Sequence, residues 1–312
     1  MYLGIDIGGT QIKFAAVRSR GHVVSRGVLD TPSIGARAAL RRVATAATTL
    51  VPGVHWKAVG IGCAGLVRPG AGTLVTSPNL PEWEGTRLAG IARRAFGVYV
   101  RVENDATSAA WGEYVVGGWG PCSTLILVTL GTGVGGGIIC DGRVVRGQRG
   151  FAGEIGHITV DPRGRRCRCG NRGCLESVAG GWAIVASARR ALAHRTSRYL
   201  TPWIRRDGRR LTPRLVAEAA RRGDRVARAV MADAGEALGV AISSLVNAIN
   251  PGAVVFGGGV AASFDLLEPY VRRQVTRRAF AGAAEKLRLV PSKLGNDAAV
   301  VGAALLARQT AP

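Results

Sequence analysis

A short apolar strand that runs into a turn of glycine and threonine occurs twice in this sequence, near residue 6 and near residue 130. The first is Tyr2–Ile7 followed by Gly8–Thr10, and the second is Ser123–Leu130 followed by Gly131–Gly137. Between and after them, strand and helix patterns alternate, which is typical of an α/β fold. The chain has 312 residues, enough for two ordinary domains. The repeat therefore predicts two related domains that face one cleft.

Periodicity and punctuation predict the remaining elements. Helices are expected over Ala36–Leu50, Asp105–Tyr114, Leu175–Leu192, Asp224–Ile249 and Asp297–Leu306. Asn104 or Asp105 is the expected N-cap of the second of these helices, and Asp141-Gly142 predicts a two-residue hairpin. His194–Arg210 is expected to be an arginine-rich connector.

Three glycine-rich turns follow apolar strands and indicate a nucleotide site. Five of the seven residues in Gly131–Gly137 are glycine, which is costly for an ordinary loop. Without side chains, the backbone amides of such a turn can approach a phosphate. Gly257–Gly259 is a third turn of this kind, and Asp6 leaves its strand where it can face a hydrated Mg²⁺. The turns match neither the P-loop nor the dinucleotide fingerprint, and a plain hairpin is the alternative for Gly8–Thr10.

One histidine and three cysteines lie within eighteen residues, at His157, Cys167, Cys169 and Cys174. A Cys₃His set is a common closed zinc site, and four protein ligands leave no open position for catalysis. We therefore predict a structural Zn²⁺, with three unrelated buried thiols as the alternative. Cys63, Cys122 and Cys140 lie in apolar runs and are predicted to be core thiols.

Carboxylates and amides lie beside these motifs. Glu103-Asn104-Asp105 follows the expected strand Val98–Val102, while Glu154 and Glu176 flank the cysteine cluster. Polar groups at a strand end suit a ligand site in an α/β protein, and carboxylates suit the hydroxyls of a sugar. A helix-capping cluster is the alternative for the first group.

The net charge of +22 suggests nucleic acid, but its distribution argues against that partner. Lysine and arginine number 42 against 20 acidic residues, yet no five like charges are consecutive and aromatic residues are only 5%. A basic, solvated surface is the favoured interpretation. The uncharged stretches 115–140 and 237–264 are broken by glycines, so no membrane span is expected. The start of the chain has no export signal, which predicts a cytoplasmic protein.

Taken together, the motifs resemble those of the ROK family, named for repressors, open reading frames and sugar kinases. Asp6–Thr10 is similar to its first phosphate motif, Glu103–Ala106 to its catalytic motif, and Leu130–Gly137 to its second phosphate motif. The run from Gly153 to Glu176 is similar to its zinc and sugar motif, and Asn250–Gly259 to its adenosine-side turn. The resemblance covers nearly the whole chain in order.

The resemblance implies two actin-like (ribonuclease H-like) lobes around a central cleft that binds ATP and a hexose. It implies a small lobe over residues 1–115, on which the C-terminal helix at about 297–312 packs, and a large lobe over 116–296 that carries the zinc loop. The implied cofactors are ATP, Mg²⁺ and a structural Zn²⁺. A homodimer or homotetramer is expected.

Residue roles carry over at the matching positions. Asp105 matches the base that takes the proton from the sugar hydroxyl. The implied sugar-binding residues are Asn79, Asn104, Asp105, Glu154, His157 and Glu176. The implied nucleotide-binding residues are Asp6, Gly8, Gly9, Thr10, Lys13, Thr132, Gly133, Gly135, Gly257, Gly258 and Gly259. Two positions depart from the family pattern: Glu82, where glucokinase-like members often carry Gly, and Gly180, where many members carry Ser.

The expected function is that of an ATP-dependent hexose kinase acting on the 6-hydroxyl of a sugar, with glucose as the expected sugar. The alternatives are an N-acetylhexosamine kinase for N-acetylmannosamine or N-acetylglucosamine, and a sugar-sensing regulator that does not catalyse. The first phosphate motif begins at residue 4, which leaves no room before it for the helix-turn-helix of the family's repressors. No specific nucleic-acid partner is therefore expected.

Overall fold

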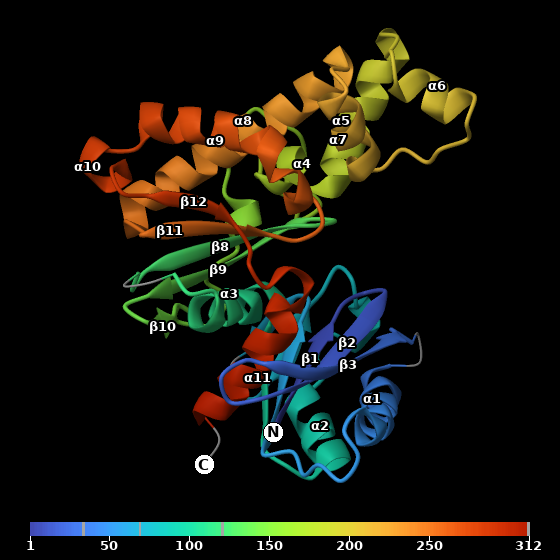
Figure 1. The fold of residues 1–312 in the computed structure, drawn as a ribbon, viewed down its shortest axis with the longest axis vertical. Helices are drawn as coiled ribbons and strands as arrows, with labels where there is room; N and C mark the ends of the chain where they lie inside the picture. Colours follow the sequence, from blue (N-terminus) through green and yellow to red (C-terminus); the bar gives the residue numbers. More distant parts are fainter. Residues whose placement is uncertain (33–34, 69, 120–121, 311–312) are drawn as a thin grey trace. The chain divides into compact units, whose positions relative to one another are not determined.

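A computed structural model describes residues 1–32, 35–68, 70–119 and 122–310 (Figure 1). The chain forms two compact units. Unit 1 comprises Met1–Leu127, Gly137–Gly153 and Ser292–Pro312, and unit 2 comprises Val128–Gly136 and Glu154–Pro291. Residues 116–127 and 137–153, which the sequence analysis placed in the large lobe, thus belong to unit 1.

Unit 1 is built on a five-stranded sheet with strand order β3-β2-β1-β4-β7. The strands are β1 (Tyr2–Ile7), β2 (Gln11–Val17), β3 (Val23–Asp30), β4 (Ala58–Cys63) and β7 (Val100–Asn104). β1 pairs antiparallel with β2 and parallel with β4, which pairs parallel with β7. All six residues of β4 are buried, because a central parallel strand is covered on both faces. β3 alternates between half-buried and exposed residues, as an edge strand does.

The helices of unit 1 are α1 (Ala36–Leu50), α2 (Leu88–Phe96), α3 (Asp105–Val116) and α11 (Ala298–Thr310). Short elements complete the unit: β5 (Leu66–Arg68), β6 (Thr73–Thr76), and the 3-10 helices η1 (Pro81–Trp83) and η4 (Gly295–Asp297). The structure confirms the expected bounds of α1. The last helix, α11, begins at Ala298, one residue later than expected.

Glycines let α11 approach the sheet closely. Gly4 and Gly60 are paired in register across β1 and β4 and lie on the same face of the sheet. A Cβ atom on Gly4 would lie 2.0 Å from the Val300 carbonyl oxygen, and one on Gly60 would lie 1.8 Å from that of Ala303. No side chain fits at these positions. The C-terminal helix therefore rests directly on the two strands that lead to the first glycine turn and to Cys63.

A second sheet has the strand order β10-β9-β8-β11-β12. Its strands are β8 (Leu125–Leu130), β9 (Val134–Cys140), β10 (Arg143–Val144), β11 (Ala253–Gly257) and β12 (Arg288–Pro291). The predicted hairpin joins β9 to β10: Asp141 and Gly142 have positive φ angles of 48° and 71°. Such angles are those of a type I′ turn, which the Asp-Gly pair favours.

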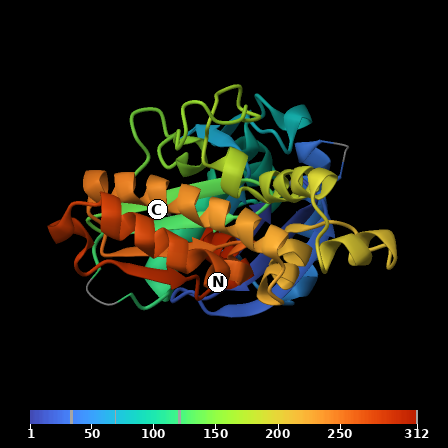
Figure 2. The ribbon, with the colours of Figure 1, turned by 90° about the horizontal axis from the view of Figure 1, so that it is seen from above.

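The helices of unit 2 are α4 (Glu176–Ala179), α5 (Gly181–His194), α6 (Leu200–Arg205), α7 (Pro213–Arg221), α8 (Arg225–Ile249), α9 (Phe264–Arg278) and α10 (Ala281–Ala284), with the 3-10 helices η2 (Ile155–His157) and η3 (Ala261–Ser263). α8 and α9 lie side by side (Figures 1 and 2). A Cβ atom on Gly239 of α8 would lie only 2.5 Å from Cβ of Gln274 on α9. Among the described residues, α8 is the one helix long and apolar enough to cross a membrane. However, 61% of its most apolar 18-residue stretch is buried within the protein.

Three expectations about unit 2 were wrong. The helix expected over Leu175–Leu192 is interrupted at Gly180, whose extended backbone separates α4 from α5. The connector His194–Arg210 contains the helix α6, which no local sequence pattern predicted. Leu200, its first residue, is fully buried and anchors it. Asp224 is the N-cap of α8 rather than its first residue, and its side chain accepts a hydrogen bond from the Ala227 N–H.

Candidate active site

The first glycine turn joins β1 to β2 and offers fewer free amides than expected. The Gly8 N–H donates to the Gln11 carbonyl at 3.0 Å, and the Thr31 hydroxyl donates to the Gly8 carbonyl at 2.7 Å. The Gly8 amide is therefore hydrogen-bonded within the turn, and its contact with a phosphate stays a prediction. Gly9 and Thr10 remain exposed at the tip of the turn.

The same turn lies against the segment that carries Asn79. A Cβ atom on Gly9 would lie 2.9 Å from the Asn79 carbonyl oxygen, so only glycine fits there. The Asn79 residue itself is exposed. The structure thus brings one predicted sugar-binding residue next to one predicted phosphate-binding residue within unit 1.

Asn104 and Asp105 mark the point where β7 ends and α3 begins. The Asn104 side chain caps α3 by accepting a hydrogen bond from the Thr107 N–H at 2.9 Å, as one of the two predicted N-caps. Its amide donates to Asp105 Oδ1 at 3.0 Å, and the Ala106 N–H donates to the same oxygen at 2.9 Å. These two bonds fix the Asp105 carboxyl group through one oxygen and leave Oδ2 as the atom that can take a proton.

Asp105 raises the pKa of Asp6, which belongs to the same unit. Burial raises the pKa of Asp105, although hydrogen bonds from the Ala106 N–H and the Asn104 side chain lower it. Burial, followed by repulsion from Asp105, raises the pKa of Asp6 to about 7, and Lys13, its cross-strand partner, offsets this only in part. Asp105 is therefore a better base than an ordinary aspartate, whose pKa is about 3.9.

The raised pKa of Asp6 predicts a pH-dependent stability. At this site the folded chain binds a proton more tightly than the unfolded chain, so the contribution of Asp6 to the free energy of unfolding is present below the unfolded pKa, about 3.9. It is lost as the pH rises through about 7. In EDTA, Asp6→Asn is expected to melt close to wild type near pH 4 and above wild type at pH 8, because the stabilisation is lost between the two pKa values. Calorimetry at both pH values measures this, and a Tm difference that does not grow with pH would contradict it.

Glu103, beside Asn104, is buried and paired with two arginines. Its Oε2 lies 2.7 Å from Nε of Arg146 and 3.5 Å from a guanidinium nitrogen of Arg101. Glu103 lies in the predicted catalytic motif, but no sequence motif indicated Arg146, which lies 43 residues away and beyond the β9–β10 hairpin. A buried carboxylate is costly unless it is paired, so this ion pair fixes the end of β7.

The second glycine turn, which we call the glycine loop (Gly131–Gly137) and which belongs to unit 2 as far as Gly136, contacts the Glu176 side chain. The Val134 N–H donates to Glu176 Oε2 at 3.0 Å. A Cβ atom on Gly133 would lie 2.2 Å from the same oxygen, so the loop passes directly over the carboxylate. Glu176 was predicted as a sugar-binding residue; in the structure its carboxylate contacts the glycine loop.

The third turn, Gly257–Gly259, also packs against the start of the glycine loop. Gly258 has a φ of 88°, and a Cβ atom there would lie 2.5 Å from the Leu130 carbonyl oxygen. The Val260 N–H donates to that same carbonyl at 2.8 Å. Two of the three predicted phosphate turns are therefore neighbours within unit 2.

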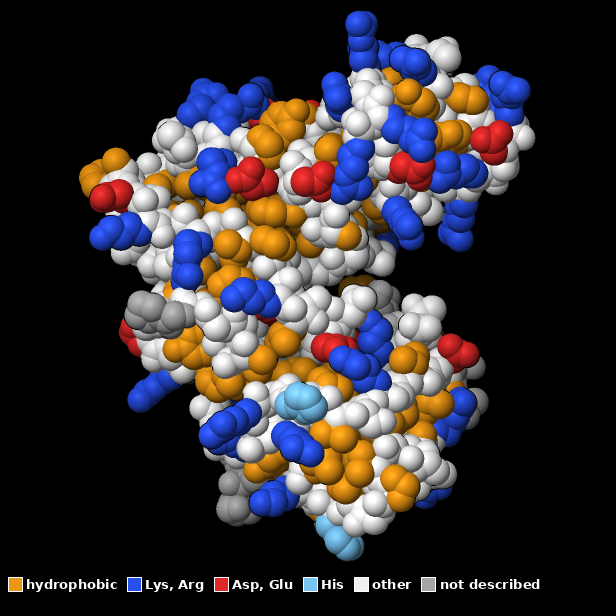
Figure 3. Space-filling view, viewed as in Figure 1, with side chains coloured by type: hydrophobic (Ala, Val, Ile, Leu, Met, Phe, Trp, Pro, Cys, Tyr) orange, Lys and Arg blue, Asp and Glu red, His pale blue; other side chains and the backbone are white. Residues whose placement is uncertain are grey.

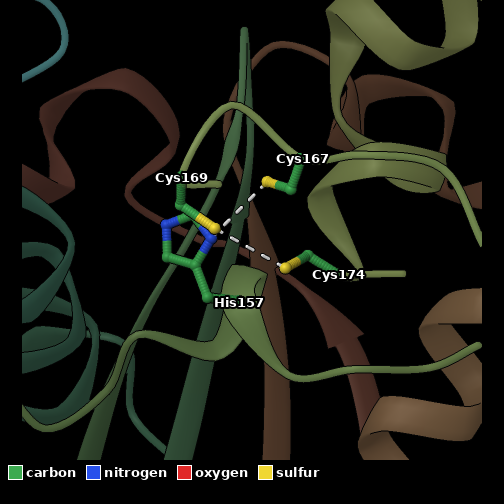
Figure 4. A group of neighbouring side chains, drawn as sticks. All are labelled: His157, Cys167, Cys169 and Cys174. Atoms are coloured by element: carbon green, nitrogen blue, oxygen red, sulfur yellow. Dashed lines mark hydrogen bonds between the residues drawn. The ribbon is translucent and has the colours of Figure 1, made fainter. Parts of the chain in front are cut away.

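The predicted metal ligands converge in unit 2 (Figure 4). The ligand atoms of His157, Cys167, Cys169 and Cys174 all lie within 4.8 Å of one another. The Cys169 and Cys174 sulfurs are 3.7 Å apart, and the Cys167 sulfur lies 3.8 Å from Nδ1 of His157. A tetrahedral zinc with Zn–S bonds of 2.3 Å requires sulfurs about 3.8 Å apart. The donor set and its spacing therefore fit Zn²⁺.

The other predicted site residues and cysteines divide between the units. Glu154, the N-cap of η2, and His157 lie in unit 2, and the His157 N–H donates to the Glu154 carbonyl. Cys63 is a buried core thiol as predicted, and burial raises its pKa. Cys122 and Cys140 are only half-buried, so the prediction that they are core thiols was wrong. Both lie at the ends of apolar runs, where the chain reaches the surface.

Arginine is concentrated over α5, α6 and α7, where blue side chains gather in Figure 3. Residues 189–228, which we call the basic surface, carry 13 arginines and three carboxylates. Two aromatic rings, Tyr199 and Trp203, stack 5.5 Å apart, and Arg209 lies 4.5 Å above the Trp203 ring. These rings are covered by guanidinium groups of the same chain, which argues against base stacking.

The basic surface is expected to bind DNA only through its charge. We predict duplex binding weaker than about 1 µM at physiological salt, with an affinity that falls steeply as salt is added. Fluorescence anisotropy with labelled duplexes between 50 and 300 mM salt measures it. Sequence-specific binding in the low nanomolar range at physiological salt would contradict the prediction.

Residues 2–310 match the ROK family. The chain is 35% identical to the glucokinase of Streptomyces coelicolor over 99% of this chain and 98% of that protein. It is 32% identical to the N-acetylmannosamine kinase of Escherichia fergusonii, over 98% of each chain. A solved ROK family glucokinase from Streptomyces griseus, in complex with glucose and AMPPNP, superposes with a TM-score of 0.85 at 35% identity and covers 99% of both chains.

Proposed function

The chain belongs to the ROK family, and from that premise we propose that it is an ATP-dependent hexose kinase that phosphorylates the 6-hydroxyl of glucose. The observation that carries the proposal is Asp105, held by two hydrogen bonds at the end of β7 with one carboxyl oxygen left to accept a proton. The full-length similarity to glucokinases, one of them solved with glucose and an ATP analogue, supports the same sugar and donor. Both actin-like lobes of that fold are present in the chain.

In this proposal Asp105 orients the sugar hydroxyl and removes its proton. The O–P bond forms to the γ-phosphorus of ATP while the bond to the β–γ bridging oxygen breaks, and the hydroxyl proton passes to Asp105 Oδ2. Products are the sugar 6-phosphate and ADP. Phosphoryl transfer has a loose transition state, so positioning and charge neutralisation contribute most of the catalysis. The raised pKa of Asp105 favours proton uptake.

The remaining predicted residues have binding roles. Asn79, Asn104 and Asp105 of unit 1 and Glu154, His157 and Glu176 of unit 2 would contact the sugar. Exposed amides of Gly9 and Thr10, and the turns at Thr132–Gly135 and Gly257–Gly259, would contact the nucleotide. Asp6 and Lys13 lie beside the first turn. Asp6, whose charge is opposed by burial and by Asp105, would help to hold Mg²⁺, which neutralises phosphate charge when bound.

We further propose that His157, Cys167, Cys169 and Cys174 hold a structural Zn²⁺, which would supply no chemistry beyond fixing their loop. Nδ1 of His157 faces the cysteines, so Nε2 remains for a sugar hydroxyl. We also propose that the enzyme is cytoplasmic and forms a homodimer or homotetramer; light scattering of the purified protein measures its mass.

The second candidate is an N-acetylmannosamine kinase, which the similarity to the Escherichia fergusonii enzyme favours. A coupled ADP-release assay separates the two. Glucose, N-acetylmannosamine and N-acetylglucosamine are compared at equal concentrations with ATP, and glucose with polyphosphate as donor. The proposal predicts the highest kcat/KM for glucose with ATP. A higher value for either N-acetylhexosamine would replace glucose as the substrate, and no turnover with any sugar would favour a regulator.

A further inference from the structure

Three side chains connect the cysteine loop (Cys167–Cys174) to the glycine loop within unit 2. The guanidinium of Arg168, between two predicted zinc ligands, lies 4.8 Å from the centroid of the Trp182 ring. The indole N–H of Trp182 donates to Glu176 Oε1 at 3.3 Å. The other oxygen of Glu176 accepts the Val134 N–H of the glycine loop. Each member therefore contacts the next, from one loop to the other.

The backbone at the start of α5 holds the glycine loop as well. The Gly181 N–H donates to the Gly131 carbonyl at 3.0 Å, and the Trp182 N–H donates to the Thr132 carbonyl at 3.2 Å. The first half of the loop is thus tied to α5 and the second half to Glu176. Trp182 takes part in both attachments, through its backbone and through its ring.

The position of the Glu176 carboxylate matters because it carries negative charge beside a loop proposed to bind phosphates. A free carboxylate there would rotate among rotamers and compete with phosphate for the loop amides. The Trp182 N–H restrains Oε1, so that Oε2 engages the Val134 amide and no other. A hydrogen bond to a charged acceptor is stronger than one between neutral groups, so the indole N–H holds the carboxylate firmly.

We infer that Trp182 is a positioning residue for the nucleotide. It holds Glu176 so that the glycine loop keeps its phosphate-binding conformation. Arg168, which is fixed in the cysteine loop, restrains the Trp182 ring by contacting it. The expected effect on nucleotide affinity rests on the proposed kinase function. The expected effect on the order of the glycine loop does not. It also assigns Glu176 a role beyond sugar binding.

The test uses Trp182→Phe, which keeps a ring for Arg168 to stack on and removes the indole N–H. In the ligand-free protein, hydrogen exchange of the amides in residues 131–136 is expected to accelerate. By calorimetry, affinity for AMPPNP is expected to fall about tenfold, the scale of one hydrogen bond to a charged group. Glucose affinity is expected to fall by a smaller factor than AMPPNP affinity, because Glu176 is only one of several proposed sugar contacts. In steady state, KM for ATP is expected to rise by a larger factor than KM for glucose.

Trp203→Phe is the matched control. Trp203 is another half-buried tryptophan of unit 2 and is also stacked by an arginine, Arg209. Trp203→Phe should leave the hydrogen exchange of the amides in residues 131–136 and the AMPPNP affinity unchanged. Arg168→Gln, which removes the charge but keeps the cysteines, is expected to weaken AMPPNP binding by a smaller factor, with wild-type zinc content.

Two results overturn the inference. One is unchanged exchange at residues 131–136 in Trp182→Phe. The other is an AMPPNP affinity that falls by no more than the glucose affinity does, which would indicate that the variant is generally loosened. The exchange measurement needs no ligand, so it decides the inference even if wild type binds no nucleotide, which would refute the proposed function alone.

Discussion

Replacing Asp105 by asparagine is expected to lower kcat by at least about 10²-fold, and by up to about 10⁴-fold, because general base catalysis typically contributes that much. Asparagine keeps the shape of the side chain, and its oxygen can still accept from the Ala106 N–H as Oδ1 does. It cannot take the proton of the sugar hydroxyl. Glucose affinity should change little, since most contacts to the sugar remain.

The control for this variant is Asp207→Asn, which removes one carboxylate from an exposed position after α6 in unit 2. It should retain wild-type kcat. Single-turnover measurements of sugar phosphate in Asp105→Asn show whether the chemical step itself is slowed. If the variant retains more than about a tenth of wild-type kcat, Asp105 is not the base.

Zinc content is expected to be about one ion per chain, and Cys169→Ser is expected to remove it. Serine cannot supply the thiolate that a closed Cys₃His site needs, and structural zinc sites contribute folding energy directly. We expect the Tm to fall by roughly 5 °C or more, a few kcal/mol for a chain of this length. Because the cysteine loop leads into Glu176, sugar and nucleotide binding should suffer as well.

Elemental analysis of the purified protein and calorimetry measure these effects. Cys140→Ser, at a half-buried cysteine of unit 1 outside the cluster, is the control and should keep both metal and Tm. A wild-type protein that carries clearly less than one zinc per chain, after purification without chelators, would contradict the assignment. So would a Cys169→Ser protein with full zinc content.

Local sequence was sufficient wherever a structure depends on neighbouring residues. The Asp141-Gly142 turn and the bounds of α1 were predicted, and Asn104 was one of two predicted N-caps of α3. Caps, turns and amphipathic periods all involve residues a few positions apart. The metal cluster was predicted for the same reason, since its four ligands lie within eighteen residues.

Interactions between distant residues were beyond the sequence. Nothing in the pattern indicated that Arg146 pairs with Glu103, that Trp182 contacts Glu176, or that the Gly8 amide is used inside its own turn. These contacts depend on how strands and loops meet in three dimensions. The sequence predicted candidate site residues, whereas the structure was needed to see which of their atoms are already hydrogen-bonded within the chain.

The central claim, that the chain is an ATP-dependent glucose kinase, is tested most directly by identifying its product. Purified protein is incubated with glucose and ATP, and the reaction is followed by ³¹P NMR. The account predicts glucose 6-phosphate and ADP in equal amounts, with no product from Asp105→Asn on the same timescale. Release of inorganic phosphate without a sugar phosphate, or phosphate on a hydroxyl other than the 6-hydroxyl, would contradict it.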